Sequence, residues 1–143
     1  MNVEVNYWAV LLAAISSMVV GALWYSSVGF GEVWMKLAKI DRKELEKNRK
    51  NSPIMYLYVF VASLITAYIL AHVTFLSHRF FHDTYATDAV ITAFWLWLGF
   101  TATRILTHDI FEMRRKKLTL LTISHELVTV MVMALIIGYM GVN

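Results

Sequence analysis

Residues 112–140 read EMRRKKLTLLTISHELVTVMVMALIIGYM, and this stretch decides the fold. Four consecutive basic residues precede an apolar run long enough to cross a bilayer as a helix, which takes about 20 mostly apolar residues. Charged loops and apolar runs alternate in the same way toward the N-terminus. We therefore expect an all-α integral membrane bundle of four transmembrane helices, at about residues 7–28, 54–77, 86–107 and 118–139.

The basic residues give this bundle an orientation. Of the thirteen Lys and Arg residues, all but Arg79 lie in or beside the loop 29–53 and the turn 108–117. Loops rich in Lys and Arg stay in the cytoplasm. We therefore expect a multi-pass protein of the cell membrane, with both termini outside and these two loops cytoplasmic.

The composition narrows the class of protein further. With 143 residues, 59% of them hydrophobic, four crossings and their connections fill nearly the whole chain, so residues 1–143 are expected to form a single domain. The chain has no Cys, which excludes disulfides, thiolate catalysis and Cys-bound metal clusters. Basic loops beside transmembrane helices are attracted to anionic lipid headgroups. Membrane lipids are therefore expected partners, whereas nucleic acid is not.

Small residues recur at every fourth position of the first helix, at Ala9, Ala13, Ser17 and Gly21. This spacing lets the backbone of another helix approach closely. We expect Ala13, Ser17 and Gly21 to pack against a helix of the same bundle or of another subunit in a homo-oligomer.

The segment after the first helix, GFGEVWMKLAKI at residues 29–40, is amphipathic. Its large apolar residues share one helical face, and its charged residues lie elsewhere. This pattern is typical of a short helix in the membrane interface. We expect such an interfacial helix in the first cytoplasmic loop.

Ionisable groups at membrane depth are costly and need a partner, a wet cavity or a route to the surface. Four such groups lie in the last two helices: Arg104, His108, His125 and Glu126. Arg104 and Glu126 are equally far from Arg115, in the middle of the hairpin turn, so the sequence predicts an ion pair between them. Alternatively, the Arg104 side chain extends along its helix to the lipid headgroups, and the polar residues serve only to stabilise the hairpin of the last two helices.

The favoured function is binding by a non-enzymatic membrane protein. Trp24 and Tyr25 end the first helix on the same side as the four ionisable groups, so together they predict a polar vestibule on the cytoplasmic side. Because Arg presents a planar fork of donors, a small anionic or amphipathic ligand or a lipid headgroup would suit it. A homo-oligomeric small-solute transporter or channel is the alternative.

An intramembrane enzyme is the third hypothesis, since the sequence shows no recognisable pair of nucleophile and base. His108, His125 and Glu126 form neither an H-x-x-x-H nor an H-E-x-x-H motif, so neither a metal site nor a cofactor is expected.

Three stretches carry a resemblance to a known family: GALWYSSVGFGEVWMK, FWLWLGFTAT and RRKKLTLLTISHELVTVMVMALIIG. The chain resembles, over nearly its full length, the small four-helix integral membrane proteins of domain of unknown function 1761. The residues that match the family's most specific block are Gly21, Trp24, Tyr25, Ser26, Phe30, Gly31 and Trp34. Ser27 departs from the family pattern, which commonly has Pro there, so the bend after the first helix is expected to be less sharp. The resemblance implies a multi-pass membrane protein and no particular activity.

Overall fold

The computed structural model describes residues 3–43, 46 and 53–142, which form helices and connections without a strand. The helical elements are α1 (Tyr7–Trp24), α2 (Gly31–Ala38), α4 (Pro53–Phe81), α5 (Tyr85–Leu96), a π-helical segment η1 (Trp97–Ala102), α6 (Thr103–Phe111) and α7 (Lys116–Met140). Since α5, η1 and α6 are continuous, four helices are long and apolar enough to cross a membrane. The predicted all-α fold with four such helices is confirmed. Of the predicted loop 29–53, residues 44–45 and 47–52 lie outside the described part of the chain.

The first helix ends at Trp24, earlier than the predicted Val28, because a compact turn replaces its last residues. The Ser26 hydroxyl donates to the Leu23 carbonyl at 2.7 Å and accepts from the Gly29 amide at 3.2 Å. A Cβ on Gly29 would lie 2.3 Å from the Leu23 carbonyl oxygen, and one on Gly31 would lie 2.4 Å from that of Tyr25. Both positions therefore require glycine, which explains the two glycines that follow the Trp-Tyr-Ser block.

Other helices run past the predicted apolar spans. α4 continues to Phe81 where residue 77 was the expected end, and α6 continues to Phe111 where residue 107 was expected. A hydropathy pattern marks the part of a helix that suits hydrocarbon, and the backbone can stay helical beyond it. Residues 108–111, expected in a cytoplasmic loop, are therefore helical.

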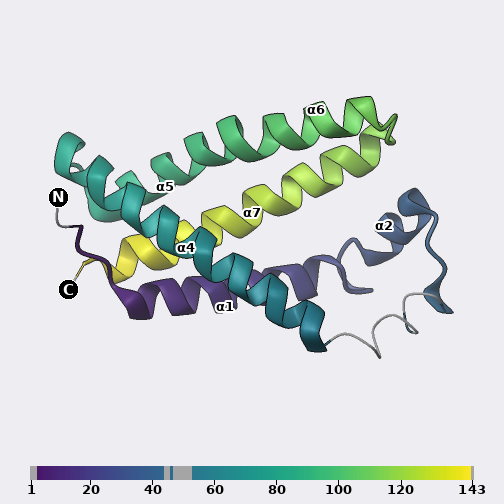
Figure 1. Ribbon diagram of the computed structural model, residues 1–143, viewed down its shortest axis with the longest axis horizontal. Coiled ribbons are helices and arrows are strands. Elements are labelled where there is room, and N and C mark those ends of the chain that lie inside the picture. Colours follow the sequence, from purple (N-terminus) through teal and green to yellow (C-terminus); the bar gives the residue numbers. More distant parts are fainter. Residues whose placement is uncertain (1–2, 44–45, 47–52, 143) are drawn as a thin grey trace.

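The helices run alternately up and down. Figure 1 shows both termini at one end of the molecule, with the turn between α6 and α7 and the short helix α2 toward the opposite end. Helix α1 packs against α4 and α7, and helix α5 packs against the same two. The four spanning helices therefore form a bundle in which α1 and α5 lie across from each other.

The end that carries the termini is closely packed by small side chains. Its buried alanines come from all four spanning helices: Ala9, Ala13, Ala14, Ala67, Ala71, Ala89, Ala93 and Ala134. The approach is closest where a Cβ on Gly138 of α7 would lie 2.7 Å from the Ala86 Cα of α5. Small residues permit such close helix contacts inside membranes. We call this part of the bundle the closed end.

Candidate functional site

A cavity of about 1130 Å³ lies among α1, α2, α4, η1 and α7. Its walls are the second half of α1 with the turn that follows, the first half of α4, and the middle of α7, all beyond the closed end. We call this cavity the vestibule. Its lining is mixed, with aromatic and aliphatic side chains around a few hydroxyls and ionisable groups.

The polar group of the vestibule comes from the middle of α7. His125 Nδ1 lies 3.3 Å from Glu126 Oε1, and His125 Nε2 lies 3.4 Å from the Thr129 hydroxyl. The His125 side chain is 13% exposed, whereas that of Glu126 is 41% exposed. The Glu126 carboxylate is therefore accessible from the cavity, while the imidazole is held beside it.

Aromatic rings from the end of α1 and the turn that follows it contact this imidazole. The Tyr25 ring lies 5.1 Å from the His125 ring and 5.4 Å from the Trp34 ring, between centroids. Trp24 contacts His125 from another side, with 5.7 Å between centroids. Trp24 and Tyr25 thus pack against the imidazole of α7, and Trp34 of α2 packs against Tyr25.

The Glu126 carboxylate also affects the pKa of the Tyr25 phenol. Burial raises the pKa of the Tyr25 phenol above its ordinary value, the negative charge of Glu126 raises it further, and Arg114 lowers it. Because an ordinary phenol titrates near about pH 10, the Tyr25 hydroxyl is protonated at neutral pH and can donate a hydrogen bond.

The inner wall of the vestibule joins α1 to α4. The Ser17 hydroxyl bonds to the Ser63 hydroxyl at 2.8 Å, and both residues line the cavity. Of the three residues expected to pack helices, Ala13 and Ser17 are buried and Gly21 is partly buried. A Cβ on Gly21 would lie 3.7 Å from His125 Nε2, an ordinary contact distance. Gly21 therefore faces α7.

The predicted ion pair between Arg104 and Glu126 is wrong. Arg104 is exposed, and in the described part of the chain no acidic group lies within ion-pair distance of it. The buried residues of this segment are Ala102 and Asp109. Arg104 follows Ala102 by two residues, so its side chain is rotated by about 200° around the helix axis from that of Ala102. Arg104 therefore points away from α7, although its depth resembles that of Glu126.

His108 also lies outside the vestibule. It is exposed on α6, with Nδ1 3.6 Å from Asp109 Oδ1 and Nε2 3.4 Å from Glu112 Oε1. Of the six residues expected to form the site, the structure therefore brings together Trp24, Tyr25, His125 and Glu126, and separates Arg104 and His108 from them.

Sequence reasoning overlooked Asp109, whose side chain is only 3% exposed. Its Oδ2 accepts a 2.7 Å hydrogen bond from the Thr119 hydroxyl of α7, and its Oδ1 lies 3.3 Å from Arg114 Nη1. This residue carried no prediction from the sequence, because acidic residues next to basic turns are usually solvated. The sequence feature that could have identified this contact is Thr119, which lies at a similar distance on the other side of the α6–α7 turn.

His108, Asp109 and Glu112 offer donor atoms within 4.8 Å of one another. Imidazole and carboxylate are ligands that Zn²⁺ and similar cations accept. However, the Asp109 oxygens already bind Thr119 and the Arg114 guanidinium. We therefore interpret this cluster as the connection that closes the α6–α7 hairpin.

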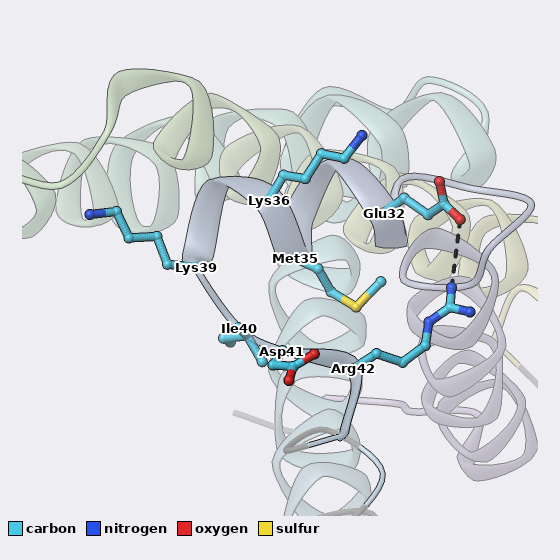
Figure 2. A pocket seen from close by; sticks show the side chains of 7 residues that line it. All are labelled: Glu32, Met35, Lys36, Lys39, Ile40, Asp41 and Arg42. Atoms are coloured by element: carbon cyan, nitrogen blue, oxygen red, sulfur yellow. Dashed lines mark ion pairs between the residues drawn. The ribbon is translucent and has the colours of Figure 1, made fainter.

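A shallower hollow of about 510 Å³ borders the mouth of the vestibule beside α2. Met35, Ile40 and Arg42 line both spaces. Figure 2 shows Arg42 paired with Glu32, at 3.5 Å, on one side of this hollow and Lys39 on the other. Both members of the pair are largely exposed, so this part of the mouth is charged and open.

A second buried carboxylate lies at the closed end. Asp88 of α5 is 2% exposed and lies 2.8 Å, through Oδ2, from His78 Nδ1 of α4. The neighbouring His82 and Asp83 lie between α4 and α5 and are exposed to solvent. This pair links α4 to α5 and lies outside the vestibule.

Four long apolar helices, with a cavity among them that ionisable and hydroxyl side chains line, define a helical membrane protein with polar groups inside the bundle. A family model described as "Protein of unknown function (DUF1761)" matches residues 8–138. The chain belongs to this family, as the resemblance of its Trp-Tyr-Ser block predicted. It matches no curated protein and no solved structure.

Proposed function

We propose that this protein is a non-enzymatic membrane protein whose vestibule binds a small amphipathic molecule. The observation that carries the proposal is the contrast between the two ends of the bundle: alanines close one end, while the other holds a cavity of about 1130 Å³. Ligand sites are typically concave, largely apolar and equipped with a few convergent polar groups. The vestibule has this character, with Tyr25, His125 and Glu126 as its polar groups.

We further propose that the vestibule opens toward the cytoplasm of a cell membrane. It lies nearer the basic α6–α7 turn and the basic segment around α2 than the end that carries the termini. Basic loops stay cytoplasmic, so both termini would then face outward. The same rule supports placing the amphipathic helix α2 in the cytoplasmic interface, where its Trp34 would suit the headgroup level.

Binding is favoured over catalysis by the geometry around His125. A hydroxyl, an imidazole and a carboxylate occur here in the order used by hydrolase triads. Yet the two contacts, at 3.3 and 3.4 Å, are longer than the 2.6–3.2 Å of a formed general-base hydrogen bond, so a triad is not assembled in this state. Assays with p-nitrophenyl esters check this point, and turnover that disappears in Thr129→Val would favour an enzyme.

A homo-oligomeric transporter remains the alternative proposal. A cavity that is open at one end and closed at the other resembles one state of an alternating-access carrier. Transport would further require a path through the closed end, where Ala9, Ala134 and Ile137 are at most 1% exposed. Flux of a solute that binds the vestibule, measured in proteoliposomes, would favour this alternative over simple binding.

Energy transfer from tryptophan to dansylamide, a neutral amphipathic probe, tests the binding proposal. The protein is placed in nanodiscs, and empty nanodiscs correct for partitioning of the probe into lipid. Trp34 and Trp97 line the vestibule and would be efficient donors. We expect a saturable component of energy transfer.

Two neighbouring substitutions on α4 form a matched pair for this experiment. Ala62 lines the vestibule, whereas Val61 is 44% exposed and is not among its lining residues. Ala62→Phe should fill space in the cavity and weaken probe binding at least tenfold, while Val61→Phe should leave it unchanged. Purely linear partitioning in the unsubstituted protein, or equal binding by the two variants, would contradict the proposal.

A further inference from the structure

The vestibule contains a carboxylate without a fixed positive partner. Glu126 lies ten residues after the start of α7, roughly 15 Å along the helix, where a charge without a counter-charge is unfavourable. Among residues 3–43, 46 and 53–142, the only basic side chain within ion-pair distance of Glu126 is His125. Arg104, which the sequence offered as its partner, faces away.

A neutral His125 satisfies both of its polar contacts. Because an ionised carboxylate only accepts hydrogen bonds, Nδ1–H of a neutral His125 would donate to an ionised Glu126, and Nε2 would then accept from the Thr129 hydroxyl. In this arrangement the imidazole orients the carboxylate and leaves its negative charge in place.

Two further charged residues line the vestibule in the described part of the chain. The lining contains Arg42 and Glu46 in addition to Glu126, and Arg42 is engaged by Glu32 at 3.5 Å. Lys36 and Lys39 belong to the neighbouring hollow. An ionised Glu126 would therefore leave the inner part of the vestibule with a negative charge that a bound cation could neutralise.

Aromatic side chains complete this environment. Tyr25, Trp34, Tyr56 and Trp97 line the same cavity as Glu126. Aromatic faces attract cations through the ring quadrupole, and this attraction grows when water is excluded. An apolar cation would therefore find both a counter-charge and favourable ring contacts.

We propose that the ligand of the vestibule is an amphipathic organic cation, held by the Glu126 carboxylate among the aromatic side chains of Tyr25 and Trp34. This inference rests on the proposed binding function and specifies its ligand class. It reverses the expectation of an anionic ligand, which depended on Arg104. A quaternary ammonium or phosphonium group with aromatic or aliphatic substituents has the required chemistry.

Tetraphenylphosphonium and tetraphenylborate test the sign of the charge, because the two ions have nearly the same size and shape. Binding is measured by equilibrium dialysis against the protein in nanodiscs of zwitterionic lipid, with empty nanodiscs subtracted. We expect the cation to bind at least tenfold more tightly than the anion. Equal or tighter binding of the anion would overturn the inference while leaving the binding proposal intact.

Glu126→Gln is nearly isosteric and locates the site. It should weaken phosphonium binding at least tenfold without weakening borate binding. Glu112→Gln is the control, because Glu112, the residue that caps the C-terminus of α6, is 58% exposed and lies outside the vestibule. Equal loss in both variants would contradict a site at Glu126. If neither ion binds saturably, this inference fails, whereas the dansylamide experiment decides separately whether the vestibule binds an amphipathic molecule at all.

Discussion

The Thr119 hydroxyl donates a 2.7 Å hydrogen bond to Asp109 Oδ2 and joins α7 to α6 across the hairpin. Both side chains are buried. Thr119→Val keeps the shape of the side chain but removes the donor, so a buried carboxylate loses a partner. Such a loss costs about 1–3 kcal/mol, and we expect a lower melting temperature in detergent.

Thr107→Val is the matched control on the same hairpin. The Thr107 hydroxyl is exposed and donates to the Thr103 carbonyl within its own helix at 2.8 Å. Its loss should change stability by less than about 0.5 kcal/mol. Equal melting temperatures for the two variants would show that the bond to Asp109 contributes nothing to the hairpin.

Gly138→Ala should loosen the closed end. The new Cβ would lie 2.7 Å from the Ala86 Cα and 3.1 Å from the Ala89 Cβ, so α5 and α7 would have to separate. Overpacking of this kind costs about 1–3 kcal/mol. Thermal unfolding should therefore begin at a lower temperature.

Gly99→Ala provides the comparison, since a Cβ at Gly99 meets nothing within 4 Å. We expect no loss of stability there. If Gly138→Ala is equally well tolerated, the contact between α5 and α7 is less tight than described.

Arg104→Met and Glu126→Gln should have independent effects. Their side chains point to different surroundings, one exposed on the outer face of α6 and the other in the vestibule. Effects at separate sites add to within about 0.3–0.5 kcal/mol. A double-mutant cycle on thermal stability measures this, and a clearly larger coupling would restore the ion pair that the sequence suggested.

The number and type of the helices could be predicted because a bilayer demands long apolar runs between charged loops. The face that each helix presents was harder to predict. Arg104 and Glu126 were placed together by counting from Arg115, which fixes depth along antiparallel helices and leaves rotation undetermined. No residue pattern predicts the π-helical segment Trp97–Ala102, which changes the direction in which the following side chains of the helix point.

The vestibule was predicted only in part, for a related reason. Trp24 and Tyr25 could be grouped with His125 and Glu126 because both sets were predicted to lie on the same side of the bundle. Ser63 and Trp97 line the cavity too, yet each looks ordinary in an apolar run. Their role depends on how far α1 and α4 separate from α7, which single-helix patterns do not encode.

The orientation can be tested with single cysteines, since the natural chain has none. Asp83→Cys lies in the connection between α4 and α5, and Met113→Cys lies in the α6–α7 turn; both positions are exposed. A membrane-impermeant maleimide added to intact cells should label the first and spare the second. The reverse pattern would mean that the vestibule opens to the outside.

A crystal structure with tetraphenylarsonium tests the central claim most directly, because arsenic gives an anomalous signal that lipid and detergent lack. The account predicts one strong arsenic peak inside the vestibule, among Tyr25, Trp34 and Glu126. Soaking the Glu126→Gln variant should remove it. An arsenic peak only at the exposed carboxylates of Glu32 or Glu112, or only on the outer surface of the helices, would contradict the claim that the vestibule is a binding site for organic cations.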